Sequence, residues 1–349
     1  MPEQSLAEIT ASMVAPGKGI LAVDESNGTC NGRFEKLGIP PTIEMRQAYR
    51  ELLLSVRGLN AFVSGAILYD ETIRQSSAAG IPFAKLMHDA GMLPGIKVDA
   101  GTEPLAGSPR ETITFGLDGL RKRVAEYHAM GARFAKWRAV IRISVDGLPS
   151  RACIEANAQA LARYAALCQE GGLVPIVEPE VLMDGDHTIE RCYDVTIEVL
   201  RAVFTQLTIH NVVLEHIVLK PSMVIEGTDC ATRSSVEEVA RATMSCLSRT
   251  VPAAVGGVAF LSGGQSNEVA SAHLNAMFDG AGSAKPWPLT FSYGRALQQP
   301  ALHLWKGQAA NIPAAQAALY HRAMCNSEAA LGRYTAATEH HAERVLVES

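Results

Sequence analysis

The sequence predicts an α/β fold in which one (β/α)8 TIM barrel, with an N-terminal helix and a flexible C-terminal tail, forms a single domain. Three observations predict it. Eight short apolar segments rich in β-branched residues recur along the chain, and a longer segment with helical spacing follows most of them. No linker or low-complexity tract interrupts the 349 residues. Eight such units favour closure into a barrel over an open doubly wound sheet.

The predicted elements alternate in order along the chain. Strands are predicted at 19–25, 61–69, 95–99, 132–138, 173–180, 216–220, 255–264 and 288–294. Helices are predicted at 44–56, 116–130, 154–170, 188–207, 235–249, 265–278 and 312–332, where apolar residues recur at the spacing of one helix face. The barrel domain is expected to span residues 1–335, and the polar segment 336–349 to form the tail.

Composition excludes several classes of protein. The formal net charge of -5 argues against nucleic-acid binding, and no stretch reaches the roughly 20 apolar residues of a membrane span. The first residues lack the apolar core of a signal peptide, and the seven cysteines form no CxxC pair. The ten histidines show no tight metal-binding spacing. We therefore expect a cytoplasmic protein with reduced thiols and no metal centre.

Charged residues lie in or directly after five of the predicted strands, where packing alone would favour apolar ones. The active sites of such barrels assemble at the carboxyl ends of the strands. Because residues two apart on a strand point to the same side, Lys136 and Arg138 should share a face, as should Glu178 and Glu180. The full set is Asp24, Glu25, Lys97, Asp99, Lys136, Arg138, Glu178, Glu180 and Lys220.

A structural interpretation competes for each of these residues taken singly. A strand-end lysine such as Lys220 is usually a rim charge, and Glu178 or Lys136 alone could belong to a structural ion pair. Removing three cations and at least three carboxylates from water at one end of the barrel would cost much free energy, which packing alone does not explain. Their joint occurrence therefore predicts a catalytic site.

Two glycine-containing segments follow the seventh and eighth predicted strands. Loops at these positions of such barrels commonly bind phosphate through backbone N–H groups, and glycine lets the main chain approach the ligand closely. An arginine there can contact two phosphate oxygens at once. The alternative is that both are simple turns. The residues concerned are Ser262, Gly263, Gly264, Ser292, Gly294 and Arg295.

Seven segments of the chain resemble, in order and without large gaps, the signature segments of class I (Schiff-base) fructose-bisphosphate aldolases. The resemblance runs from about residue 5 to residue 335, and the segment DESNGTC (24–30) looks closer to plastid and photosynthetic-lineage members than to animal ones. The segments are LAVDES (21–26), GIKVD (95–99), RFAKWR (133–138), PIVEPE (175–180), LKPSM (219–223), FLSGGQS (260–266) and FSYGRAL (291–297).

The resemblance implies a role for each matching catalytic position. Lys220 matches the lysine that forms the imine, Glu178 the acid and base that assists its formation, and Glu180 the supporting neighbour of Glu178. Lys136 matches a cation beside the imine, and Asp24 the carboxylate that deprotonates the C4 hydroxyl. Burial and nearby cations favour the neutral amine that such a lysine needs, and Glu180 should help to keep one carboxyl of the pair protonated.

The resemblance also implies the substrate-binding residues and partners. Lys97 and Arg138 match cations on the C6-phosphate side of the cleft, with Arg33 nearby. The six residues of the two late loops match the site of the other phosphate. The implied partners are a phosphorylated ketose and triose phosphates, and the protonated imine serves as the electron sink, so no cofactor is expected. The family usually forms homotetramers, which implies a homo-oligomer.

Three departures from the family pattern stand out. The chain ends in Leu346-Val347-Glu348-Ser349 without the terminal tyrosine that is thought to transfer a proton to the enamine. Gly32 and Ala100 replace lysines of many relatives and reduce the positive charge around the cleft.

The implied reaction is the reversible cleavage of fructose 1,6-bisphosphate to dihydroxyacetone phosphate and glyceraldehyde 3-phosphate, part of glycolysis, gluconeogenesis or the Calvin cycle. The same chemistry with a preference for sedoheptulose 1,7-bisphosphate or fructose 1-phosphate is the first alternative. A metal-dependent barrel aldolase and a non-catalytic scaffold are the others. The absent metal motif argues against the former, and the presence of Lys220, Glu178 and Asp24 against the latter.

Overall fold

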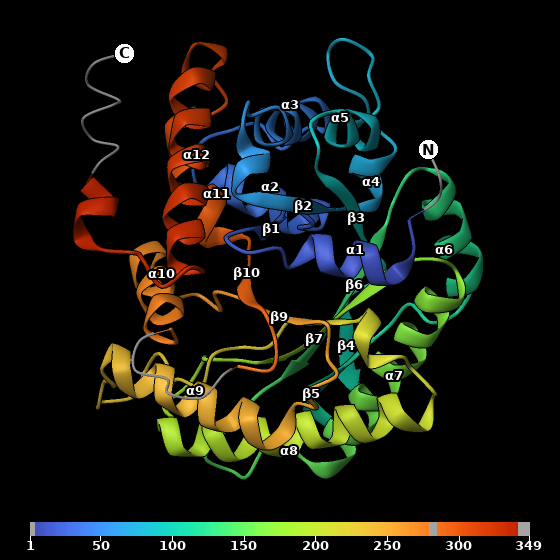
Figure 1. Ribbon diagram of the computed structural model, residues 1–349, viewed down its shortest axis with the longest axis vertical. Coiled ribbons are helices and arrows are strands. Elements are labelled where there is room, and N and C mark those ends of the chain that lie inside the picture. Colours follow the sequence, from blue (N-terminus) through green and yellow to red (C-terminus); the bar gives the residue numbers. More distant parts are fainter. Residues whose placement is uncertain (1–3, 279–284, 341–349) are drawn as a thin grey trace.

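The computed structural model describes residues 4–278 and 285–340, and its eight-stranded parallel sheet closes into a barrel (Figure 1). The predicted (β/α)8 fold is therefore confirmed. The order around the barrel is β1-β10-β9-β8-β7-β6-β3-β2, so the first and last strands pair and no edge is left open. The strands are β1 (Gly19–Ala22), β2 (Val63–Leu68), β3 (Leu93–Lys97), β6 (Phe134–Ile141), β7 (Val174–Val181), β8 (Val218–Leu219), β9 (Gly257–Phe260) and β10 (Leu289–Tyr293).

Helices cover the outside of the barrel (Figure 1). Four of the long ones, α7 to α10, begin directly after a serine or threonine whose hydroxyl accepts a hydrogen bond from a backbone N–H of the first turn. The outer helices are α2 (Asn27–Glu35), α3 (Ile43–Leu54), α4 (Asp70–Ile73), α5 (Phe83–Asp89), α6 (Leu120–Ala129), α7 (Arg151–Glu170), α8 (Ile189–Ile209), α9 (Val236–Thr250), α10 (Asn267–Ala276), α11 (Arg295–Trp305) and α12 (Ile312–Ala329). Short 3-10 turns are η1 (Leu59–Ala61), η2 (Leu214–His216) and η3 (Ala309–Asn311).

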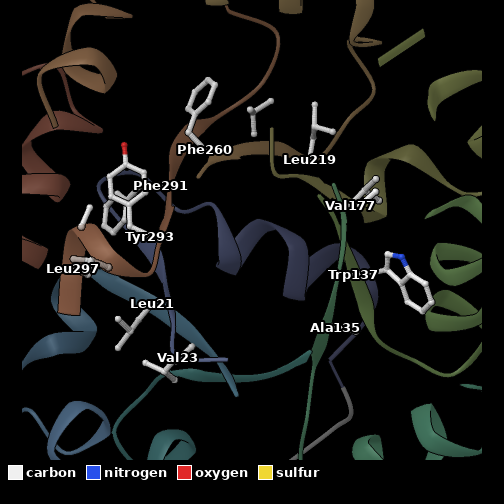
Figure 2. Packing of buried hydrophobic residues seen from close by; sticks show 14 of the residues in the cluster. Leu21, Val23, Ala135, Trp137, Val177, Leu219, Phe260, Phe291, Tyr293 and Leu297 are labelled. Atoms are coloured by element: carbon white, nitrogen blue, oxygen red, sulfur yellow. The ribbon is translucent and has the colours of Figure 1, made fainter. Parts of the chain in front are cut away.

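Alternate side chains of the barrel strands point to opposite sides of the sheet. Ala135, Trp137, Val177 and Leu219 belong to the large apolar cluster between the barrel and the helices, and Figure 2 shows them directed away from the barrel axis. Lys136 lies between two of these residues on β6 and therefore points inward.

The N-terminal helix α1 (Leu6–Met13) covers the amino end of the barrel. Its residues Ile9 and Met13 form a second apolar cluster with inward-pointing residues of the barrel, among them Phe134, Val174 and Val218. These three are the first residues of β6, β7 and β8, so the cluster fills the lower part of the barrel interior. The predicted N-terminal helix is confirmed, and polar chemistry is confined to the carboxyl end.

Several elements differ from the prediction. An antiparallel hairpin, β4 (Thr102–Leu105) with β5 (Ser108–Thr114), and the helices α2, α4, α5 and α11 were not predicted. Lys136 and Arg138 were expected to end their strand, but β6 continues to Ile141 and places both within it. Val140 and Ile141 continue the parallel pairing with β7 opposite Glu180 and Val181, which carries β6 beyond its charged positions.

No helix among the described residues is long and apolar enough to cross a membrane. Of the predicted tail, residues 336–340 are helical, and Glu339 accepts a hydrogen bond from Tyr334 at 2.6 Å. The rest of the predicted tail, 341–349, lies outside the described residues.

Candidate active site

A cavity of about 910 Å³ opens at the carboxyl end of the barrel. Of the fourteen predicted site residues, thirteen line it, and Gly264 contacts one of them from behind. The thirteen are Asp24, Arg33, Lys97, Lys136, Arg138, Glu178, Glu180, Lys220, Ser262, Gly263, Ser292, Gly294 and Arg295.

Four buried charged side chains form a continuous chain of contacts at the centre of the cavity. Lys220 lies directly after β8, with its Nζ 3.2 Å from Glu178 Oε1. Glu178 Oε2 is 3.1 Å from Lys136 Nζ, which in turn lies 2.7 Å from Asp24 Oδ2. All four residues are more than nine-tenths buried. Two amines and two carboxylates therefore alternate, and their charges offset one another in a site with little solvent.

Glu178 carries a depressed pKa in the substrate-free protein. Burial alone would raise the pKa of its carboxyl, but the ammonium groups of Lys136 and Lys220, together with Arg138, outweigh burial and lower it below the ordinary value. The expectation that the pair Glu178 and Glu180 keeps one carboxyl protonated therefore does not hold for Glu178. Glu180 instead pairs with the guanidinium of Arg138.

Asp24 is ionised throughout the working range of pH. Burial raises the pKa of its carboxyl, but Lys136 and Lys220 outweigh burial and bring the pKa from 3.8 down to about 2. A carboxylate held ionised in a buried site can accept a proton from a substrate hydroxyl placed beside it.

This shift predicts how Asp24 contributes to stability at different pH. A carboxyl whose pKa is lower in the folded than in the unfolded chain stabilises the fold above the unfolded value, and that stabilisation is lost as the pH falls through the folded value. Wild-type protein and Asp24→Asn should therefore differ by a constant free energy of unfolding near neutral pH. The difference should shrink by up to about 2 kcal/mol between about pH 6 and about pH 2. Urea unfolding over the accessible part of this range measures it, and a pH-independent difference would contradict the assignment.

Three cations lie on the other side of the cavity. Lys97 forms an ion pair with Asp99 and also donates a hydrogen bond to the backbone oxygen of Asp99 at 2.9 Å. The side chain of Arg138 is 41% exposed, so its guanidinium can meet a ligand while it pairs with Glu180. Lys97 and Arg33 are also partly accessible, which fits a binding region for an anionic group.

The sequence interpretation missed the residues that hold Arg33. Arg33 Nη1 lies 2.6 Å from Glu25 Oε1, and Arg50 Nη1 lies 2.8 Å from Glu25 Oε2. Gln298 donates to the same Glu25 carboxylate at 2.5 Å and itself accepts from the hydroxyl of Tyr49 at 2.9 Å. Arg50 and Gln298 come from helices α3 and α11, and no local sequence pattern links them to β1.

The two late loops follow β9 and β10, which lie across the barrel from the strands of Lys97 and Arg138, and their backbone and hydroxyl groups line the cavity. Ser262 and Gly263 follow β9, and Ser292, the last residue but one of β10, has a buried hydroxyl with no hydrogen-bond partner among the described residues. Gly294 precedes α11, whose first N–H groups have no partner within the helix. A Cβ at Gly264 (φ +104°) would lie 3.1 Å from the Arg295 guanidinium, so glycine leaves room for that side chain. The arrangement suits a phosphate.

Comparison with known proteins agrees with this geometry. The sequence profile of the family described as fructose-bisphosphate aldolase class-I matches residues 5–348. The probable fructose-bisphosphate aldolase class 1 of Xanthomonas campestris pv. campestris is 59% identical over 335 residues, which are 96% of this chain and 99% of that protein. The chain belongs to the class I fructose-bisphosphate aldolase family.

Other members of the family also resemble this chain over most of its length. The cytosolic fructose-bisphosphate aldolase 4 of Arabidopsis thaliana is 53% identical over 319 residues, 91% of this chain and 81% of that protein. A solved structure of the Plasmodium falciparum aldolase superposes with a TM-score of 0.92 at 47% identity and covers 95% of both chains. The family places the chain among the aldehyde-lyases that cleave fructose 1,6-bisphosphate, as the sequence predicted.

Proposed function

We propose that Lys220 is the lysine through which this chain cleaves fructose 1,6-bisphosphate. Its amine is buried at the centre of the cavity, 3.2 Å from Glu178, and this contact is the observation that carries the proposal. The Glu178 carboxylate first takes a proton from the Lys220 ammonium, and the neutral amine then attacks the ketose carbonyl carbon; a proton moves from the nitrogen to the oxygen to give a carbinolamine. Glu178 returns its proton to the carbinolamine hydroxyl, which leaves as water. The product is a protonated imine on Lys220.

The second step breaks the bond between C3 and C4 of the sugar. Asp24 takes the proton of the C4 hydroxyl, the C4 oxygen forms the aldehyde carbonyl, and the electron pair of the broken bond moves into the imine to give an enamine. Protonation at C3 and hydrolysis then release dihydroxyacetone phosphate and free Lys220. Lys136 lies between Asp24 and Glu178 and stabilises negative charge on either carboxylate.

We assign the two ends of the cavity to the two phosphates. The loops with Ser262, Ser292 and Arg295 bind the phosphate on the Lys220 side of the carbonyl. The region of Arg33, Lys97 and Arg138 binds the other phosphate. The site with Arg295 should bind a phosphate of both the triose phosphate and the bisphosphate. The region of Arg138 should bind only the second phosphate of the bisphosphate.

Replacing Arg295 with alanine should raise KM for the bisphosphate by about 10- to 100-fold, because a charge-assisted hydrogen bond to phosphate contributes about 1.5–3 kcal/mol. Steady-state kinetics measure the change. Arg333→Ala is the matched control, since this arginine pairs with Glu328 near the surface away from the cavity. An unchanged KM in Arg295→Ala would contradict the assignment of the phosphate site.

Borohydride trapping tests the central proposal. The protein is mixed with dihydroxyacetone phosphate and borohydride in the presence of EDTA, and peptide mass spectrometry locates the reduced adduct. We expect a single adduct on Lys220. An adduct on another lysine would show that this other lysine, and not Lys220, is the nucleophile. Activity that is lost in EDTA without any adduct would favour a metal-dependent mechanism.

The finer expectations from the sequence also stay proposals. We infer a preference for fructose 1,6-bisphosphate over sedoheptulose 1,7-bisphosphate and fructose 1-phosphate, which the ratio of kcat/KM on the three ketoses tests. A scaffold without catalysis would show no turnover of any of them.

We further infer a homotetramer, a cytoplasmic location and a lineage near the plastid enzymes, the last from DESNGTC (24–30).

A further inference from the structure

A second cluster of reactive side chains lies on helix α12, apart from the catalytic cavity. His321 and Cys325 are four residues apart on α12 and therefore share one of its faces. Glu339 reaches the same face from the segment that follows the helix. Among the residues that the structure describes, this is the only group of three such donors whose ligand atoms all lie within 4.8 Å of one another.

Two distances within the cluster are close to those of a tetrahedral zinc site, and the three ligand atoms all lie within 4.8 Å of one another. Cys325 Sγ is 3.4 Å from His321 Nε2, and His321 Nε2 is 3.7 Å from Glu339 Oε1. Bonds of about 2.0–2.3 Å to one ion at tetrahedral angles place sulfur, nitrogen and oxygen ligands about 3.4–3.6 Å apart. A small adjustment of side chains would bring all three donors to one ion, with a fourth position left for water.

We propose that His321, Cys325 and Glu339 bind a divalent cation of the zinc type. One sulfur, one imidazole nitrogen and one carboxylate oxygen favour zinc over magnesium or calcium, which prefer oxygen ligands alone. Cys325 is fully buried, whereas the side chains of His321 and Glu339 remain 14% and 20% exposed, so an ion has a path from solvent.

Neighbouring side chains hydrogen-bond to the Glu339 carboxylate, and one of them adds a positive charge beside the proposed ion. Arg322 pairs with Glu339 Oε1, and Tyr334 donates to Glu339 Oε2 at 2.6 Å. Ligating carboxylates in metal sites usually keep such outer hydrogen bonds. Binding converts the Cys325 thiol to a thiolate and releases its proton to solvent, so two anions face the ion and offset the Arg322 guanidinium.

A bound ion would tie the C-terminal segment to the barrel domain. Glu339 lies in the helical residues 336–340, and Cys325 also contacts the backbone oxygen of Thr338 at 3.7 Å. The same contacts could instead dock the segment without any ion. The two possibilities differ in whether the docking depends on metal.

Cobalt titration of the full-length protein distinguishes them. After EDTA treatment and dialysis, Co²⁺ should bind at one equivalent with thiolate-to-cobalt charge-transfer absorption, and Zn²⁺ should displace it. Cys325→Ala should lose this absorption, and its affinity should fall by at least about 100-fold, since even outer-shell changes cost about 10- to 100-fold. Cys246→Ala, a matched change of another buried thiol, and Cys230→Ser should both retain it.

Absence of the absorption, or its loss only in Cys230→Ser, would overturn the proposal. Hydrogen exchange of the wild-type chain gives a second test that does not depend on the folding of a cysteine variant. Zn²⁺ should slow exchange in residues 336–340 of wild-type protein by about 10-fold or more, and should not do so in Glu339→Gln. Exchange that Zn²⁺ leaves unchanged in the wild type would also overturn it.

Discussion

Lys220→Met is expected to lower kcat/KM for fructose 1,6-bisphosphate by at least about 10⁴-fold, because it removes the nucleophile while it preserves most of the side-chain volume. The variant should form no borohydride-trapped adduct with dihydroxyacetone phosphate. Loss of the Lys220 cation also removes one of the two amines beside Glu178, so the pKa of the Glu178 carboxyl should rise toward its ordinary value.

Lys85→Met is the control for this change. Lys85 lies on α5 with its side chain 63% exposed. Within residues 4–278 and 285–340 its one ion pair is with Asp89 of the same helix, so its loss should leave kcat/KM within about twofold. Circular dichroism and thermal unfolding check that both variants are folded. Residual turnover above about 1% in folded Lys220→Met would show that imine formation at this residue is not the catalytic route.

Glu178→Gln is expected to slow turnover by about 10²- to 10³-fold, the usual contribution of a general acid and base. In the substrate-free protein, Glu178 faces two ammonium groups and has a lowered pKa. Formation of the neutral carbinolamine on Lys220 removes one of these charges. The pKa of Glu178 should therefore rise at the step in which an acid is required.

Rapid-quench trapping separates this role from a structural one. Glu178→Gln should accumulate the imine adduct more slowly than the wild type, although its final extent should be similar. Glu190→Gln, at an exposed position in the first turn of α8, should behave as the wild type. Normal adduct formation in Glu178→Gln would assign the proton transfer to another group.

The sequence predicted the barrel and most of the cavity because both depend on local patterns. Short β-branched segments define the strands, and the two-residue period of a strand correctly placed Lys136 and Arg138 on one face. The pairing between strands could not be predicted in the same way. Glu180 was expected to support Glu178. In the register of β6 with β7, Arg138 lies opposite Glu178, but the side chains pair one step further along β7, Arg138 with Glu180 and Lys136 with Glu178.

Contacts between distant segments account for the remaining misses. The support of Arg33 comes from Glu25, Arg50 and Gln298, which lie up to 273 residues apart in the chain. The hairpin β4–β5 carries exposed polar residues and lacks the apolar alternation that identifies a buried strand. His321 and Cys325 have a helical spacing, but Glu339 joins them only through the fold of the following segment.

Helix α1 has a consequence for the order in which the reaction proceeds. Because Ile9 and Met13 cover the amino end of the barrel with apolar side chains, the cavity that the described residues form lies at the carboxyl end. We expect substrate to enter and both products to leave there. In the proposed mechanism, the three-carbon fragment attached to Lys220 cannot depart before hydrolysis, so the aldehyde fragment leaves first. In the synthetic direction, dihydroxyacetone phosphate must correspondingly bind before the aldehyde.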